Sequence, residues 1–384
     1  MERRKILVIG MLDSIHLSRW LKQFENEPAD FCLMPSKKFK RLHPELSKLL
    51  KSGHLAKYIL PGPYIIMRLS GYIDFVLEKL GQFLKLNLRL KVLLNIVTKK
   101  KFDYVHAIEL QGAGYLYSKL PERIQLKNTL ILTNWGSDIY FFQRSRTHSL
   151  QIEKVIRAAA FYSAECERDY DLLANYSFTG KLLPCIPNGG GFTKEEMDFQ
   201  GSPSSKRNLI LCKGYGGTFG QAQTLILPVC EILRQNISLR AFFFSVTKDT
   251  ESLLLDFTRE FGPRLKFSTV KQPLPRPELM ELFSEARIYL GCSKSDGIST
   301  AFLEAIVHGS YPIQTNTSCA LEWVKKGISA SIVNAEQFEI YNALNLAVTN
   351  DALVDFAYNN NSRIVKELLD YDKIKNIAKT FYSL

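Results

Sequence analysis

The segment Asp296-Gly-Ile-Ser-Thr-Ala-Phe-Leu-Glu304 runs on as Ala305-Ile-Val-His-Gly-Ser-Tyr-Pro312 and joins a polar glycine turn to an apolar helix. A short apolar run, Ile288–Leu290, precedes it, and a second, Tyr311–Gln314, overlaps its end. The apolar positions between them have helical spacing. They are Ala301, Phe302, Ala305 and Ile306. A strand, a helix and another strand in this order predict a parallel α/β sheet.

The polar residues of this segment predict a ligand site. Ser299 is placed to cap the helix, whose first amides lack acceptors, and such a helix end attracts phosphate. Asp296 lies before the helix and Glu304 more than a turn inside it. The two carboxylates would therefore reach different parts of one ligand with two hydroxyl-rich moieties. The alternative is that Asp296 caps a turn and Glu304 is a solvated helix residue.

The pair Asp296 and Glu304 resembles the Glu-x7-Glu signature of family 4 glycosyltransferases, with Asp in place of the first Glu. Further segments of the chain resemble the same family, in a subgroup that makes bacterial surface polysaccharides. These segments are Ser14-Ile-His-Leu-Ser-Arg-Trp20, Thr133-Asn-Trp-Gly-Ser-Asp-Ile139, Pro187-Asn-Gly189, Lys213-Gly-Tyr-Gly216 and Gly309-Ser-Tyr-Pro-Ile-Gln-Thr-Asn-Thr-Ser-Cys-Ala-Leu-Glu-Trp323. The resemblance implies a retaining enzyme with the GT-B fold, in which two Rossmann-like doubly wound domains face each other across a cleft.

The length of 384 residues is too great for one ordinary core and predicts two domains. Two sets of strand-like runs alternate with helical patterns, as in doubly wound sheets. The first set is Ile6–Ile9, Phe31–Met34, Tyr104–His106, Leu130–Leu132, Ala160–Ser163 and Leu182–Cys185, and the second is Leu209–Leu211, Arg240–Ser245, Leu265–Phe267, Ile288–Leu290, Tyr311–Gln314 and Ser329–Val333. We expect an acceptor-side domain over 1–192, a linker over 193–207 and a nucleotide-sugar domain over 208–369. By the resemblance, residues 370–384 form a helix that crosses back to the first domain.

The net charge of +12 lies in the first third of the chain, because residues 1–130 hold 23 Lys and Arg against 11 Asp and Glu. Clusters such as Lys37-Lys38 and Lys99-Lys100-Lys101 would suit anionic lipid or a polyprenyl diphosphate carrier, although a merely solubilising surface is the alternative. No basic motif of a known nucleic-acid module is present, so no nucleic-acid partner is expected. The chain shows no apolar run of about 18 residues and no signal peptide, which predicts a cytoplasmic protein, at the inner face of the membrane.

Two further sequence features bear on partners and cofactors. The seven cysteines are scattered without a Cys-x-x-Cys pair, and there is no Asp-x-Asp motif, so no metal and no cofactor is expected. Residues 72–97 follow helical spacing in their first half, while Leu84 to Leu90 alternate with polar residues. This basic apolar segment would lie either in a membrane interface or against the sheet as an ordinary helix.

On the second domain, the resemblance gives catalytic roles to Lys213, Asp296 and Glu304. Glu304 would bind the ribose hydroxyls, Asp296 would orient the transferred sugar, and Lys213 would neutralise the departing diphosphate. The donor would also contact two loops, at Gly214, Tyr215, Gly216, Gly297, Ile298, Ser299 and Thr300. The amides around Ser299 and Thr300 would hold the diphosphate, and Tyr215 would either stack on the nucleotide or pack within the protein. The family often has a second cation where this chain has Phe219.

On the first domain, the loop after the first strand carries His16, a catalytic candidate for contact with the acceptor or the diphosphate. Two further loops supply acceptor-side candidates, which are His106, Glu109, Trp135 and Asp138. Trp135 stands where many members of the family have His. Asp138 would bind a sugar hydroxyl or cap the next helix.

The sequence therefore predicts a hexosyltransferase-like enzyme that moves a sugar from a UDP- or GDP-sugar to a glycan acceptor, which we expect to be lipid-linked. The alternatives are a sugar-nucleotide epimerase and a catalytically weak glycan- or nucleotide-binding protein. A dinucleotide oxidoreductase is disfavoured, because the loop from Gly10 to His16 lacks the Gly-x-Gly-x-x-Gly fingerprint.

Overall fold

The computed structural model describes residues 3–39, 41–52, 87–198 and 201–384. The chain divides into two compact units. The first comprises Met1–Gly191 with Asp372–Leu384, and the second comprises Phe192–Tyr371. Residues 193–207, expected as a linker, are grouped with the second unit. Of the segment 72–97, residues 72–86 lie outside the described ranges, and the rest lies in a helix, α5.

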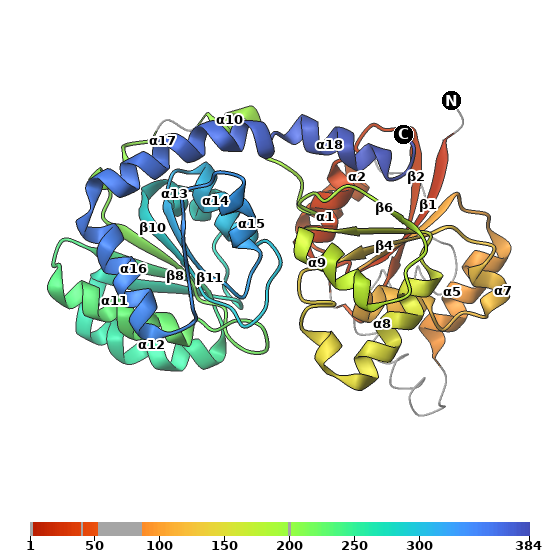
Figure 1. Cartoon of the computed structure of the whole chain (residues 1–384), viewed down its shortest axis with the longest axis horizontal. Coiled ribbons are helices and arrows are strands. Elements are labelled where there is room, and N and C mark those ends of the chain that lie inside the picture. The colour runs from red at the N-terminus through yellow and green to blue at the C-terminus, as the bar shows by residue number, and fades with distance from the viewer. Residues whose placement is uncertain (1–2, 40, 53–86, 199–200) are drawn as a thin grey trace. The chain divides into compact units, whose positions relative to one another are not determined.

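The first unit is built on a parallel sheet with the strand order β2-β1-β3-β4-β5-β6 (Figure 1). Its strands are β1 (Arg4–Gly10), β2 (Ala29–Pro35), β3 (Tyr104–Ile108), β4 (Leu130–Asn134), β5 (Phe161–Ala164) and β6 (Lys181–Leu182). Its main helices are α1 (Ile15–Lys22), α2 (Pro44–Ser52), α5 (Leu88–Lys99), α6 (Tyr115–Tyr117), α7 (Glu122–Gln125), α8 (Arg146–Ala158), α9 (Glu167–Asp171) and α18 (Tyr371–Thr380). A π-helical turn, η1 (Leu110–Gly114), follows β3.

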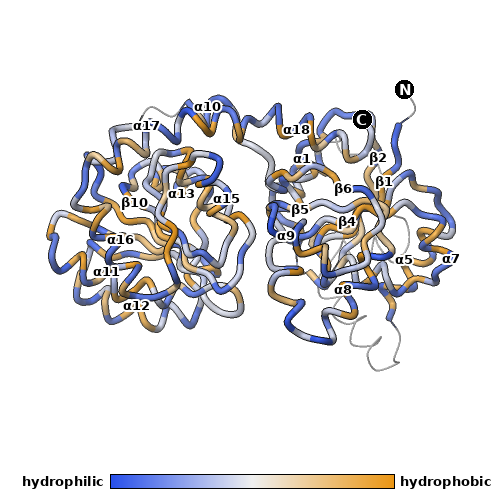
Figure 2. The backbone as a smooth tube through the Cα atoms, viewed as in Figure 1, coloured by the Kyte–Doolittle hydropathy of each residue, from blue (hydrophilic) through white to orange (hydrophobic). Residues whose placement is uncertain are grey.

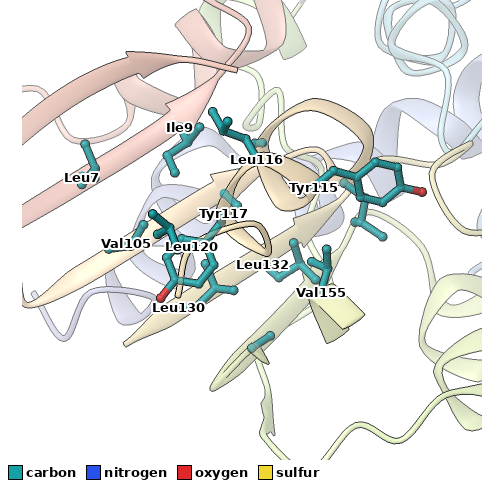
Figure 3. Close-up of a cluster of buried hydrophobic side chains, with 14 of the residues drawn as sticks. Leu7, Ile9, Val105, Tyr115, Leu116, Tyr117, Leu120, Leu130, Leu132 and Val155 are labelled. Carbon is teal, nitrogen blue, oxygen red and sulfur yellow. The ribbon is translucent and has the colours of Figure 1, made fainter. Parts of the chain in front are cut away.

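The core of this unit lies between the sheet and its helices. Leu7, Val105 and Leu130 come from three neighbouring strands and are fully buried (Figure 3). Val155 of α8 and Tyr117 of α6 belong to the same cluster. Parallel strands that are covered on both faces are apolar throughout, which explains why these strands appear in the sequence as continuous apolar runs.

The second unit repeats the design with the order β12-β11-β10-β7-β8-β9. Its strands are β7 (Leu209–Lys213), β8 (Arg240–Val246), β9 (Leu265–Thr269), β10 (Ala286–Gly291), β11 (Tyr311–Thr315) and β12 (Ser331–Val333). Its helices are α10 (Lys194–Met197), α11 (Gln223–Gln235), α12 (Lys248–Phe261), α13 (Arg276–Glu285), α14 (Thr300–Val307), α15 (Ala320–Lys325), α16 (Gln337–Thr349) and α17 (Asp351–Leu368). Hydrophobic strands run through the middle of the unit (Figure 2).

These two sheets confirm the predicted α/β fold class. Each of the twelve apolar runs overlaps a strand, although the run Leu182–Cys185 shares only Leu182 with β6. All strand pairs within the two sheets are parallel. The carboxyl ends of neighbouring strands therefore meet at one edge of each sheet, where the loops that carry the polar motifs begin.

The last residues of the chain, Asp372–Leu384, are grouped with the first unit. The hydroxyl of Tyr382 accepts a hydrogen bond from Trp20 Nε1 at 3.0 Å and lies 2.6 Å from His106 Nδ1. Glu27 pairs with two lysines of α18 at 3.5 and 3.1 Å. The chain thus returns to its first sheet after the second is complete. No helix among the described residues is both long and apolar enough to cross a bilayer.

Candidate functional site

Two loops of the second unit meet beyond the carboxyl ends of β7 and β10, which pair directly in the sheet. The first loop runs from Lys213 to Gln221, and the second runs from Gly291 to Ser299. The amide of Gln221 donates to the carbonyl of Cys292 at 3.1 Å, and the amide of Lys294 donates to the carbonyl of Phe219 at 2.7 Å. These backbone bonds hold the two loops, which are far apart in the sequence, against each other.

Lys213 connects the polar side chains of this site. Its Nζ lies 3.3 Å from Asp296 Oδ2 and donates to Ser299 Oγ at 3.2 Å. The Lys213 and Asp296 side chains are 28% and 30% exposed, so both remain accessible to a ligand. The structure therefore brings together three residues that the sequence analysis assigned to the donor. Asp296 pairs with a lysine here.

The amino end of α14 presents backbone donors to this site. Ser299 occupies the N-cap position, but its side chain makes no capping hydrogen bond and instead accepts from Lys213. No acceptor within the described residues takes the amide hydrogens of residues 297–301. Unpaired donors at a helix start carry partial positive charge, which favours an anion. The helix end and the lysine thus make one electropositive site.

The glycine loop contributes less backbone than expected. The amide of Gly214 donates to the carbonyl of Phe244 at 2.7 Å, and the amide of Gly216 donates to Thr247 Oγ1 at 2.9 Å. Both amides are therefore engaged within the protein, and the predicted donor contacts at Gly214 and Gly216 would have to use other atoms. Gly220 serves close packing, because an added Cβ would lie 1.9 Å from the carbonyl oxygen of Tyr215. Tyr215 itself is 41% exposed and free of the core.

Glu304 is buried inside α14, which contradicts the alternative that it is a solvated helix residue. Its side chain is 6% exposed and accepts from Arg276 Nη1 at 2.6 Å. Arg276 also reaches Glu196 of α10 at 3.3 Å. Burial lowers the pKa of Arg276, but the carboxylates of Glu304 and Glu196 outweigh it and raise the pKa above its usual value. Arg276 therefore stays charged and fixes one carboxylate oxygen of Glu304.

Sequence reasoning did not identify Arg276. It opens α13, directly before Pro277, in a polar stretch with no pattern that distinguishes a ligand contact from a solvated side chain. Proline at the start of a helix is a local signal for the helix and carries no information on the preceding side chain. The 28 residues between Arg276 and Glu304 hide their contact from any local pattern.

In the first unit, the structure brings His16 and Trp135 together. Ser14 caps α1 by accepting the amide of His16 at 3.2 Å, which sets the ring at the start of the helix. The ring centroids of His16 and Trp135 are 5.6 Å apart, with the planes at 63°. An edge-to-face pair of this kind orients both rings. Trp135 thus has an imidazole at its side, although its own position lacks the histidine of the family pattern.

His106 does not face a ligand, and its predicted role in acceptor positioning is wrong for this structure. The residue is fully buried, and its ring nitrogens lie 2.6 Å from the hydroxyls of Tyr382 and Thr133. Burial lowers the pKa of His106 to about 3, so the ring is neutral at pH 7. Thr133 continues the chain of hydrogen bonds to Ser163 at 2.6 Å. His106 therefore joins the C-terminal segment to the middle of the sheet.

Glu109 and Asp138 also serve their own backbone. Glu109 has φ +80° and is 6% exposed, and its carboxylate accepts the amides of Gly112 and Ala113 at 2.7 and 2.8 Å. Asp138 accepts the amides of Leu110 and Trp135, each at 2.9 Å. Both residues precede Asp138 in the chain, so these bonds do not cap the helix that follows it, which was one of its two expected roles. Glu109 in turn holds η1 and is too buried to position an acceptor.

Burial raises the pKa of Glu109 above its usual value and raises that of Asp138 well above it, where the nearby charge of Glu109 adds to the effect. The backbone amides oppose these shifts because they favour the charged form. Both carboxyls thus have a tendency to hold a proton that an exposed carboxyl lacks. The positive φ of a non-glycine residue stores strain at this loop.

Comparison with known proteins begins with two negative findings. No protein-family profile matches the sequence, and no curated protein matches it. The fold, in contrast, matches solved structures over almost its whole length. HepE of Anabaena, solved in complex with UDP-glucose, has a TM-score of 0.70 at 15% identity and covers 99% of this chain and 100% of its own.

Two further solved structures match this chain with similar TM-scores and coverage. The sucrose-phosphate synthase of Thermosynechococcus elongatus has a TM-score of 0.69 at 13% identity, over 99% of this chain and 98% of its own. A glycosyltransferase of Rickettsia africae has a TM-score of 0.65 at 12% identity, over 100% and 98%. The chain therefore has the two-sheet fold that these proteins share, which is the GT-B fold expected from the sequence.

Proposed function

We propose that the protein is a retaining glycosyltransferase that moves a sugar from a nucleoside diphosphate sugar, UDP- or GDP-linked, to a glycan acceptor. One observation carries this proposal. The amides of residues 297–301, the Lys213 ammonium and the Ser299 hydroxyl gather at the amino end of α14, at the carboxyl edge of a doubly wound sheet. A diphosphate fits this set of donors. The UDP-glucose bound in HepE, a protein of the same fold, supports the choice of ligand class.

Glu304 would bind the ribose of the donor. Its Oε1 accepts from Arg276 at 2.6 Å, and the same carboxylate would also accept the two vicinal hydroxyls of the ribose. A buried carboxylate held in a fixed orientation by an arginine favours a ligand whose hydroxyls donate to it. Arg276 would therefore set the orientation in which Glu304 meets the ribose.

The reaction follows from the charges that develop at the diphosphate. The bond between the anomeric carbon and the phosphate oxygen breaks, and the acceptor oxygen bonds to the same face of that carbon. The departing phosphate oxygen takes the acceptor's proton. Lys213 and the amides of α14 would stabilise the negative charge on the leaving diphosphate. Asp296 would orient the transferred sugar, and because the positive charge is supplied by the protein, we expect activity in the presence of EDTA.

The acceptor would bind the first unit, with His16 and Trp135 as its contacts. This unit holds 32 Lys and Arg against 18 Asp and Glu, whereas the second holds 18 against 20. A net charge of +14 favours a lipid-linked acceptor at an anionic membrane face. We therefore place the protein at the inner face of the cell membrane, in the synthesis of a surface polysaccharide.

The proposal is tested by incubating the purified protein, in EDTA, with UDP-, GDP-, ADP- and CDP-sugars. Thermal stability and release of nucleoside diphosphate are both measured. We expect one donor to stabilise the protein and to be hydrolysed slowly, and Glu304→Ala to abolish both effects. The control is Glu281→Gln, which changes an exposed carboxylate of α13 in the same unit. If no nucleotide sugar raises the melting temperature, with or without divalent metal, the proposed function is wrong.

A further inference from the structure

The charge balance of the donor site is incomplete with Lys213 alone. Its ammonium already lies 3.3 Å from the carboxylate of Asp296, so the pair is close to neutral. The diphosphate of a nucleoside diphosphate sugar carries more than one negative charge, and its negative charge increases as the bond to the sugar breaks. In residues 213–221 and 291–299, the two segments that form the site, there are two cationic side chains in all. The second is Lys294.

The backbone holds Lys294 at the place where the two segments touch. Its amide donates to the carbonyl of Phe219 at 2.7 Å, and the neighbouring residues Gly220 and Ser293 form an antiparallel bridge. Lys294 also lies two residues before Asp296 in the loop that leads to α14. The position of its Cα relative to the glycine loop is thus set by hydrogen bonds and does not depend on its side chain.

The side chain of Lys294 is weakly held. The residue is exposed, and its Nζ lies 3.4 Å from the carbonyl oxygen of Gly217, at the long end of the range for such a bond. The space beside Gly217 is open, because a Cβ added there would meet nothing within 4 Å. Four rotatable bonds give the ammonium several ångströms of reach. It is therefore able to leave a neutral carbonyl for a stronger, charged acceptor.

We propose that Lys294 is the second cation of the donor diphosphate site. It leaves the Gly217 carbonyl when the nucleotide binds and, with Lys213, neutralises the diphosphate. This role rests on the proposed function, since it needs a diphosphate at the amino end of α14. It also explains how the chain can have Phe219 where the related family often has a second cation. Lys294, in the facing loop, would supply that cation to the glycine loop.

The test compares nucleotide binding by the wild type, Lys294→Gln, Lys294→Arg and Lys206→Gln. Lys206 is an exposed lysine that precedes the amino end of β7, whereas the candidate site lies at the carboxyl end of this strand. Lys206 therefore serves as the matched control. The probes are UDP, GDP, ADP and CDP, of which the tightest is used further, together with the nucleoside of the same base. Dissociation constants are measured by calorimetry at 50 and 200 mM salt.

We expect Lys294→Gln to weaken binding of the diphosphate about tenfold at low salt and to leave nucleoside binding unchanged. Its salt dependence should also be shallower than that of the wild type, since one charge contact is lost. Lys294→Arg should restore most of the affinity, and Lys206→Gln should behave as the wild type. Equal dissociation constants for the wild type and Lys294→Gln would overturn the role of Lys294 alone.

Other outcomes are equally decisive. Parallel loss of diphosphate and nucleoside binding in Lys294→Gln would show a distorted loop and would also overturn the role. If the wild type binds none of the four diphosphates, the proposed function fails, and the role of Lys294 fails with it. The two failures are therefore distinguishable from the wild-type measurement.

Discussion

The two units have the same six-stranded parallel design, yet they use the polar residues at their strand ends in opposite ways. In the second unit, Lys213, Asp296 and Ser299 contact one another at a helix start whose amides have no acceptor in the described part of the protein. In the first unit, the carboxylates of Glu109 and Asp138 accept hydrogen bonds from four backbone amides. Under the proposed function, the same position in the fold would serve a ligand in the second unit, while in the first unit it stabilises the protein's own backbone.

The net charges of the two units do not follow the location of the candidate donor site. The first unit, with a net +14, carries the excess positive charge of the whole chain, and the second has a net −2. An excess of positive charge on a surface attracts anions at long range and is screened by salt. The amino end of α14 would instead act on an anion through a few oriented hydrogen-bond donors. We therefore expect the nearly neutral unit to bind anions more specifically, and the basic unit to attract them over a longer range.

The proposed ligand role of the second unit's polar residues is tested most directly by Lys213→Met. We expect release of nucleoside diphosphate from the donor to slow at least about 100-fold, or roughly 3 kcal/mol in the activation free energy, because an oriented cation is lost. The melting temperature should hardly change, since the side chain is 28% exposed. Turnover is measured with the donor found in the nucleotide-sugar panel, and Lys206→Met is the control. Near-normal turnover would remove Lys213 from the site.

The architectural role of the first unit is tested by Tyr382→Phe. The change leaves the buried Trp20 Nε1 and His106 Nδ1 without the hydroxyl, which should lower the free energy of unfolding by about 2 kcal/mol. Turnover per folded molecule should stay within about twofold. Chemical denaturation and a steady-state assay of the same preparation provide the two numbers. Lost turnover at unchanged stability would instead connect this network to the ligand.

Arg276→Gln should sharpen the role of Glu304. Without the guanidinium, the buried carboxylate is less well oriented, and we expect KM for the donor to rise roughly tenfold, about 1.4 kcal/mol, with a smaller change in kcat. A nucleotide analogue without ribose hydroxyls should bind the variant and the wild type alike. If the analogue loses as much affinity as the natural nucleotide, Arg276 acts on another part of the donor.

The smallest expected effect is a dependence of the first unit's stability on pH. Because burial raises the folded-state pKa of Asp138 above its usual value of 3.8, the folded protein binds more protons, and stability falls as pH rises above that value. Asp138→Asn should make this decline shallower between pH 4 and 7, because the substituted side chain binds no proton in this range. Both proteins are measured in a Trp323→Phe background, in which tryptophan emission comes from Trp20 and Trp135 of the first unit alone. Identical slopes would contradict the prediction.

Much of the fold was accessible from the sequence. Buried parallel strands are apolar along their whole length, so runs such as Ile6–Ile9 and Leu209–Leu211 mark β1 and β7 without any knowledge of their neighbours. The residues of the candidate site in the second unit could also be proposed from the sequence, because Asp296, Ser299 and Glu304 lie on one turn and the helix that follows it. The weak run Leu182–Cys185 failed in part, since β6 is a short strand at the edge of its sheet.

The sequence by itself determined two parallel sheets and the loops at their carboxyl edges, because periodicity and turn residues are local properties of the chain. Tertiary structure decided what each polar side chain at those edges bonds to. His106 and Tyr382 are 276 residues apart, and Lys213 and Asp296 are 83 apart. A histidine near the end of a strand has the same local pattern whether it meets a ligand or a buried tyrosine. Only the packing of distant segments supplies or withholds its partner, and that partner fixes its role.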